Sequence, residues 1–108
     1  GHSGILPACI QAVEAVDTAL GKVMAAMKQV GGEMIVTADH GNIEQLRDPV
    51  TGQPHTAHTT NLVPLVVMSD RPFQVRAEGG SLPDVMPTIL HMMGIEQPKE
   101  MTGSSLVS

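Results

Sequence analysis

The stretch Met34-Ile35-Val36-Thr37-Ala38-Asp39-His40-Gly41-Asn42 decides the fold of this chain. Residues 34–38 are short, rich in β-branched side chains and largely apolar on both faces, which is typical of a buried strand in a parallel sheet. Asp39 and His40 follow directly. Because ligands of open α/β sheets bind at the carboxyl ends of the strands, the stretch predicts an α/β fold with a binding site at Asp39-His40.

A long amphipathic helix is predicted before this strand, over about residues 5–30. Its apolar positions recur every three or four residues, which is the spacing of one helix face. They include Ile10, Val13, Leu20, Met24, Met27 and Val30. Ser3 can cap the start, and Pro7 is tolerated in the first turn. Gly31-Gly32 ends the helix, because glycine permits a left-handed cap.

Residues 43–61 are polar and contain Pro49, Gly52 and Pro54, so a loop is predicted, with one helical turn near Glu44–Leu46. A loop of this length in a compact domain is usually functional or mobile. Residues 62–68 predict a second buried strand. Pro64 lacks a backbone donor, so it belongs at the beginning of that strand or on an edge.

The rest of the chain predicts one short strand and one helix. Residues 69–82 are irregular, although 73–76 can pair as an edge strand. Asp84 can cap a helix from Val85 to Met93, and Gly94 can end it. From Glu96 onward the sequence predicts coil.

This order of elements predicts a right-handed α/β unit. Residues 34–38 and 63–68 are expected to be parallel neighbours, with the helix 5–30 packed on one face of their sheet. Two or three strands are too few to form a self-sufficient sheet. Further strands are therefore expected from sequence outside residues 1–108 or from a partner.

Composition excludes several classes of function. The formal net charge is -5, and the six Lys and Arg residues are scattered, so no basic stripe can follow a nucleic acid. An anionic substrate would need cations from metal ions or from another segment. Cys9 is the only cysteine, which excludes an internal disulfide and suits a reducing, cytoplasmic setting. No apolar run approaches the roughly 20 residues that span a membrane.

The chemical candidates are Asp39-His40 and the histidines of the loop, His55 and His58. A carboxylate beside an imidazole suits Zn, Mn or Co, and Gly41 permits the backbone turn that would bring both onto one ion. Two alternatives stay open. Asp-His-Gly-Asn is also a good turn sequence, and loop histidines are commonly exposed without a role.

Two motifs make the pattern specific: Thr37-Ala38-Asp39-His40-Gly41-Asn42, and Thr56-Ala57-His58-Thr59-Thr60-Asn61 followed by Val63-Pro64. They resemble the C-terminal motif pair of cofactor-independent phosphoglycerate mutases, in the alkaline-phosphatase superfamily. Gly1-His2-Ser3-Gly4 and residues 100–103 resemble the same family, and residues 84–90, ending in Met93-Gly94, resemble the last helix of the superfamily. The resemblance covers essentially the whole chain. It implies that residues 1–108 are the C-terminal segment of a phosphatase-like three-layer domain with a mostly parallel sheet, and that Gly1-His2 is native.

The resemblance also implies a site with two divalent ions, manganese with cobalt and zinc as alternatives. Asp39 and His40 would bind one ion. His2 and His58 would bind the other. His55 would have no metal role, although a misaligned loop would exchange His55 and His58.

The activity implied is the interconversion of 3-phosphoglycerate and 2-phosphoglycerate through a phosphoserine enzyme, in glycolysis and gluconeogenesis. The family's nucleophilic Ser, a further Asp, a carboxylate shortly before His2 and an inserted phosphotransferase domain would lie outside residues 1–108. No serine of the chain occupies the nucleophile motif. These serines are Ser3, Ser69, Ser81, Ser104, Ser105 and Ser108. The chain alone is therefore predicted to be inactive, with the upstream part of the same protein as its partner.

Two other interpretations of the sequence are alternatives to the mutase. Another member of the superfamily, such as a phosphopentomutase, a phosphatase or a sulfatase, would also carry the Asp-His pair. Thr59-Thr60-Asn61 after His58, and Gly4 after Gly1-His2-Ser3, favour the mutase. A reading of a different class is a non-catalytic metal-binding or assembly module, which the missing nucleophile would suit.

Overall fold

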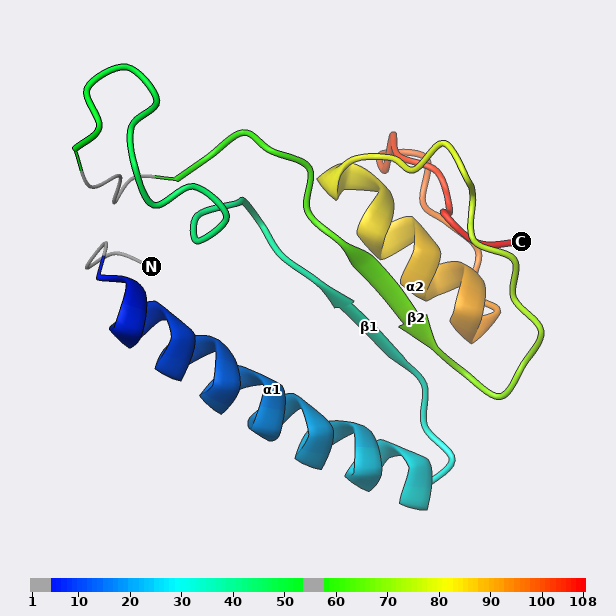
Figure 1. The fold of residues 1–108 in the computed structure, drawn as a ribbon. Coiled ribbons are helices and arrows are strands. Elements are labelled where there is room, and N and C mark those ends of the chain that lie inside the picture. Colours follow the sequence, from blue (N-terminus) through cyan, green and yellow to red (C-terminus); the bar gives the residue numbers. More distant parts are fainter. Residues whose placement is uncertain (1–4, 54–57) are drawn as a thin grey trace. The chain divides into compact units, whose positions relative to one another are not determined.

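The computed structural model describes residues 5–53 and 58–108 (Figure 1). The chain divides into two compact units, here called the first unit, Gly1–Met68, and the second unit, Ser69–Ser108. The elements in chain order are α1 (Leu6–Gln29), β1 (Met34–Thr37), β2 (Leu65–Met68), the short 3-10 helix η1 (Leu82–Asp84) and α2 (Val85–Met93).

The predicted N-terminal helix is confirmed as α1, with a proline in its first turn. Its predicted cap, Ser3, lies outside the described residues. At its other end, Gly31 adopts a left-handed conformation with φ +67°. The N–H of Gly32 donates to the carbonyl of Met27 at 2.8 Å, which satisfies one of the last free carbonyls of the helix. Neither α1 nor any other helix among the described residues is long and apolar enough to cross a bilayer.

The apolar stripe of α1 stays largely exposed. Cys9 is buried, but Val13 is 51% exposed and Val16 66% exposed. The prediction that this helix packs on a face of the sheet is therefore not confirmed. Strands of four residues span about 13 Å, whereas a helix of 24 residues spans about 36 Å, so these strands offer too little surface to cover α1.

The two predicted strands are neighbours, as expected, but their predicted parallel direction is wrong. β1 and β2 pair antiparallel, from Met34 opposite Met68 to Thr37 opposite Leu65. A parallel pair needs a crossover connection, usually a helix, and the described part of the connecting chain contains none. The chain instead doubles back as a wide hairpin (Figure 1). A sheet with a mostly parallel order in a larger domain remains a prediction.

Both strands are shorter and less buried than predicted. Their residues are half-buried or exposed, and Val66 is 53% exposed. β2 begins directly after Pro64, whose carbonyl accepts a hydrogen bond from the Thr37 hydroxyl at 2.8 Å. The predicted helical turn near Glu44–Leu46 is not confirmed. The chain forms a hydrogen-bonded turn over residues 42–45 instead, in which the N–H of Gln45 donates to the carbonyl of Asn42 at 3.2 Å.

The second unit holds the predicted C-terminal helix as α2, which ends at Gly94 with φ +70°. Asp84 precedes α2, but its carboxylate turns back to the N–H of Ser81 at 2.8 Å and caps η1 instead. It also accepts from the N–H of Ser104 at 2.9 Å. This hydrogen bond from Ser104 is the largest cause that lowers the pKa of Asp84, followed by the bond from Ser81.

The predicted edge strand at residues 73–76 pairs with the end of the chain. Gln74 and Ser108 exchange backbone hydrogen bonds of 3.1 and 3.0 Å, and Val75 forms an antiparallel bridge with Val107. The segment after Glu96 has no helix, as predicted. It is nonetheless packed, because Leu106 is 5% exposed and Val107 4%.

Candidate metal centre

The hairpin between β1 and β2 brings the two sequence motifs together. Asp39 and His40 are the second and third residues after the end of β1, and His58 lies on the returning chain before β2. Between them, Gly41 and Thr59 form an antiparallel bridge, in which the N–H of Thr59 donates to the carbonyl of Gly41 at 2.9 Å. We refer to residues 39–61 as the site hairpin, of which 39–53 and 58–61 are described.

Three of the four predicted ligands are neighbours in the site hairpin. The rings of His40 and His58 are stacked, with centroids 3.7 Å apart and planes inclined by 13°. Asp39 Oδ1 lies 3.5 Å from His40 Nε2. The Asp39 side chain is 81% exposed and that of His40 33%, so both remain accessible. The fourth predicted ligand, His2, lies outside the described residues.

Hydrogen bonding orients the His40 ring. Its Nδ1 lies 2.9 Å from the carbonyl oxygen of Gly41. A carbonyl only accepts, so Nδ1 carries the hydrogen, and a neutral ring then presents a lone pair at Nε2. That nitrogen lies 3.5 Å from Oδ1 of Asp39, so a cation between the two atoms would be attracted by both. Metal-binding histidines commonly use the other ring nitrogen in this way, on a backbone carbonyl.

The donor set fits a divalent metal ion in chemistry and in spacing. Imidazole nitrogen and carboxylate oxygen suit Zn and Mn. Bonds of about 2.0–2.2 Å in tetrahedral geometry place two ligand atoms about 3.3–3.6 Å apart. The separation of 3.5 Å between Asp39 Oδ1 and His40 Nε2 falls in that range. Among residues 5–53 and 58–108, however, no three His, Cys, Asp or Glu side chains converge as a complete metal site.

The stacked rings limit how His40 and His58 can share a metal. The lone pair of an imidazole nitrogen lies in the ring plane, and the two nearly parallel rings are 3.7 Å apart. Each ring therefore directs its nitrogen lone pairs within a plane of its own. The two histidines in this arrangement suit separate ions, and the ions of two-metal sites are about 3.5–4 Å apart.

Sequence reasoning missed Glu44, which ties the site hairpin together. Its Oε2 accepts from the N–H of Asn42 at 2.8 Å. Its Oε1 accepts from the hydroxyl of Thr59 and from Nδ2 of Asn61, the latter at 3.1 Å. The Thr59 hydroxyl, followed by the backbone N–H of Glu44 itself and then by that of Asn42, lowers the pKa of Glu44 to about 2. We call this set of contacts the Glu44 clamp. The only sign of this role in the sequence was the presence of an acidic residue between the two motifs.

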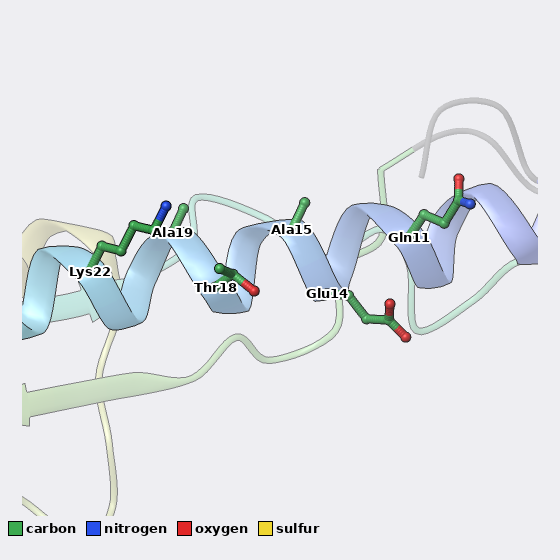
Figure 2. Close-up of a pocket in the computed structure, with 6 residues that line it drawn as sticks. All are labelled: Gln11, Glu14, Ala15, Thr18, Ala19 and Lys22. Carbon is green, nitrogen blue, oxygen red and sulfur yellow. The ribbon is translucent and has the colours of Figure 1, made fainter.

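A shallow depression lies on α1, away from the candidate ligands (Figure 2). All of its residues come from the same helix, three or four positions apart. They are Gln11, Glu14, Ala15, Thr18, Ala19 and Lys22. No candidate ligand contributes to it, so we do not assign it a chemical role.

Comparison with known proteins gives a consistent picture. Residues 1–97 match the model of the metalloenzyme superfamily. The chain is 56% identical over 107 residues to the 2,3-bisphosphoglycerate-independent phosphoglycerate mutase of Pseudomonas savastanoi pv. phaseolicola, covering 99% of the chain and 21% of that protein. It is also 56% identical over 108 residues to the enzyme of the same name from Cellvibrio japonicus, covering 100% of the chain and 21% of the relative. The chain thus spans about a fifth of the length of the curated relatives it matches.

Proposed function

This chain belongs to the metalloenzyme superfamily, and we propose that it forms the C-terminal metal-binding segment of a longer phosphoglycerate mutase. The longer protein would interconvert 3-phosphoglycerate and 2-phosphoglycerate in the cytoplasm. One observation carries the proposal: the site hairpin places His58 of the second motif against His40 of the first. The name that two relatives share, each 56% identical to this chain, supports the choice of reaction.

In this proposal Asp39 and His40 bind one divalent ion, and His58 binds a second together with His2. The spacing of Asp39 Oδ1 and His40 Nε2 supports the first ion. The stacked, nearly parallel rings of His40 and His58 support their assignment to different ions. We propose manganese, with cobalt and zinc as alternatives, because the ligands are nitrogen and oxygen.

When bound, such ions would neutralise charge on the transferring phosphoryl group and lower the pKa of an attacking hydroxyl. The residues of this chain would prepare the site for them. The carbonyl of Gly41 holds the proton of His40 on Nδ1 and keeps Nε2 available. Asp39 contributes negative charge. Because Asp39 and His40 are assigned to the ion in this proposal, the nucleophilic serine is expected from the rest of the longer protein.

Replacing each of the two loop histidines by alanine, in separate variants, tests the proposal. In the longer protein, His58→Ala should lower turnover by more than about 100-fold, since loss of even an outer-shell partner costs about 10–100-fold. The matched variant His55→Ala should have a much smaller effect. Formation of 2-phosphoglycerate is measured across a manganese titration. If His55→Ala is the damaging change, the assignment of the loop is wrong; if neither change matters, the metal site is refuted.

A further inference from the structure

We propose that Glu44 is a positioning residue that holds the His58 segment against the Asp39-His40 segment and thereby sets metal affinity. The inference rests on the proposed function, because it presumes that these side chains bind metal ions. Glu44 would touch neither the metal nor the substrate. It would act only through the residues of the Glu44 clamp.

The clamp joins the neighbours of the candidate ligands on both sides of the hairpin. On one side, Asn42 follows Asp39-His40 by two residues and donates its N–H to Glu44 at 2.8 Å. On the other side, Thr59 directly follows His58 and donates its hydroxyl to Glu44. One carboxylate therefore fixes both motifs, and the stacked pair of rings lies within the segment that it closes.

Gly41 lies directly beneath the contact between Glu44 and Thr59. We expected this glycine to permit a turn, but it is not among the glycines with positive φ. Its role is steric. A Cβ on Gly41 would overlap Oε1 of Glu44 and Oγ1 of Thr59, closer than real Cβ atoms approach. Gly41 is itself buried, so the clamp passes directly over its backbone and requires the missing side chain.

The chemistry of the clamp requires a carboxylate rather than an amide. All three partners supply hydrogens: the Asn42 N–H, the Thr59 O–H and the Asn61 amide group. An ionised carboxylate is a pure acceptor and can satisfy them all. Glutamine has the same shape but would direct an NH₂ group at one of these donors. Bonds of this charge-assisted kind are roughly twice as strong as neutral ones.

The same contacts distinguish positioning from direct metal binding. Both carboxylate oxygens of Glu44 already accept hydrogen bonds from protein donors. A ligand role would compete with those bonds. A positioning role predicts that excess metal compensates for loss of Glu44, because the ligands themselves are unchanged.

The experiment measures manganese affinity in the longer protein, from the electron paramagnetic resonance signal of free Mn²⁺. Glu44→Gln should weaken binding by about 10–100-fold, the usual cost of losing an outer-shell partner. Thr59→Val should have a similar effect, whereas Thr59→Ser keeps the hydroxyl and should bind as the unchanged protein does. Glu14→Gln, on the exposed surface of α1, is the matched control for the loss of one negative charge.

Turnover at saturating manganese completes the test. Glu44→Gln should regain most of its turnover there, with an unchanged thermal unfolding midpoint in the presence of EDTA. Unchanged affinity in Glu44→Gln, or turnover that excess manganese does not restore, would overturn the positioning role. If His58→Ala also leaves affinity and turnover unchanged, the proposed function fails as well. If His58→Ala lowers affinity and turnover but Glu44→Gln changes neither, the positioning role of Glu44 is refuted and the proposed function stands.

Discussion

In the site hairpin the organising carboxylate, Glu44, is exposed, whereas in the second unit the corresponding carboxylate, Asp84, is buried. Asp84 lies beside Thr88, which is fully buried. The Thr88 hydroxyl donates to the carbonyl of Asp84 at 2.7 Å and accepts from the N–H of Leu106 at 2.8 Å. These bonds tie α2 to the end of the chain. The Glu44 clamp ties two stretches of loop whose side chains remain open to solvent.

The difference separates a structural polar network from one that serves a site. A buried bond such as that of Thr88 stabilises the fold, because breaking it leaves a desolvated group unpaired. An exposed clamp adds little to stability, since water replaces lost partners cheaply, but it restricts the geometry of the hairpin. Substitutions in the second unit should therefore change stability, and substitutions in the site hairpin should change metal binding.

The largest effect is expected from removing everything outside residues 1–108. The isolated chain should show no mutase or phosphatase turnover, even with excess manganese. The described part of the site offers ligands but no complete metal site. The family resemblance also implies that the nucleophilic serine lies outside residues 1–108. Formation of 2-phosphoglycerate and hydrolysis of a phosphate ester are the assays. Turnover by the purified chain would contradict the proposal that the nucleophile and the remaining ligands lie outside residues 1–108.

Gly41→Ala should have the next largest effect, on metal affinity. The added methyl group would displace the Glu44 carboxylate and the Thr59 hydroxyl, so the clamp opens. In the longer protein, manganese affinity should fall by at least the 10–100-fold expected of an outer-shell loss. Gly21→Ala is the control, because a Cβ at Gly21 meets nothing within 4 Å. Equal affinity in both variants would show that the clamp does not matter for the metal.

Thr88→Val should lower the stability of the fold and leave metal affinity unchanged, the opposite of what is expected for Gly41→Ala. The substitution keeps the shape of the side chain but leaves the Asp84 carbonyl and the Leu106 N–H without this partner. Unfolding by urea should show a loss of about 1–3 kcal/mol, the cost of unsatisfied buried groups. Manganese affinity should stay unchanged. Thr102→Val, at an exposed position, should alter neither quantity. A large loss of affinity in Thr88→Val would erase the distinction between the two regions.

Much of the secondary structure could be predicted from the sequence, because local signals determine it. Periodicity marked α1, and Gly94 marked the end of α2. The direction of β1 against β2 could not be predicted in this way. Apolar composition shows that a strand is present but not which way its partner runs, and the long connection was open to either topology. The second unit closes its core with Leu106 and Val107, which had no periodic pattern to identify them.

The candidate metal ligands could be predicted from their residue types, but the residues that hold them in place could not. Asp39, His40 and His58 stood out because carboxylate and imidazole groups have specific chemistry. Glu44 did not, since its role depends on Thr59, fifteen positions away along the chain. Gly41 was noticed for its conformational freedom, whereas the structure needs its lack of a side chain. Contacts across a hairpin are set by register, which local sequence does not specify.

The smallest expected effect is a dependence of the clamp on pH. Its hydrogen bonds, that from Thr59 first, hold the pKa of Glu44 at about 2, below the ordinary value of 4.5. A depressed pKa in the folded state means that the stabilisation is fully present above pH 4.5. It is lost progressively as the pH falls from about 4.5 to about 2, where protonation turns an acceptor into a donor.

In metal-free longer protein with ¹⁵N-labelled asparagine, the side-chain amide of Asn61 should report this transition, because it donates to Glu44 at 3.1 Å. Its chemical shift should move with a midpoint near pH 2 and should not move between pH 5 and 8. In Glu44→Gln the transition should vanish, since no proton can be gained at that position. Because Glu44 is exposed, the effect on global unfolding should be small, while the hairpin opens locally. A midpoint near 4.5 would mean that the carboxylate gains nothing from its three donors, and the clamp would then be too weak to position His58.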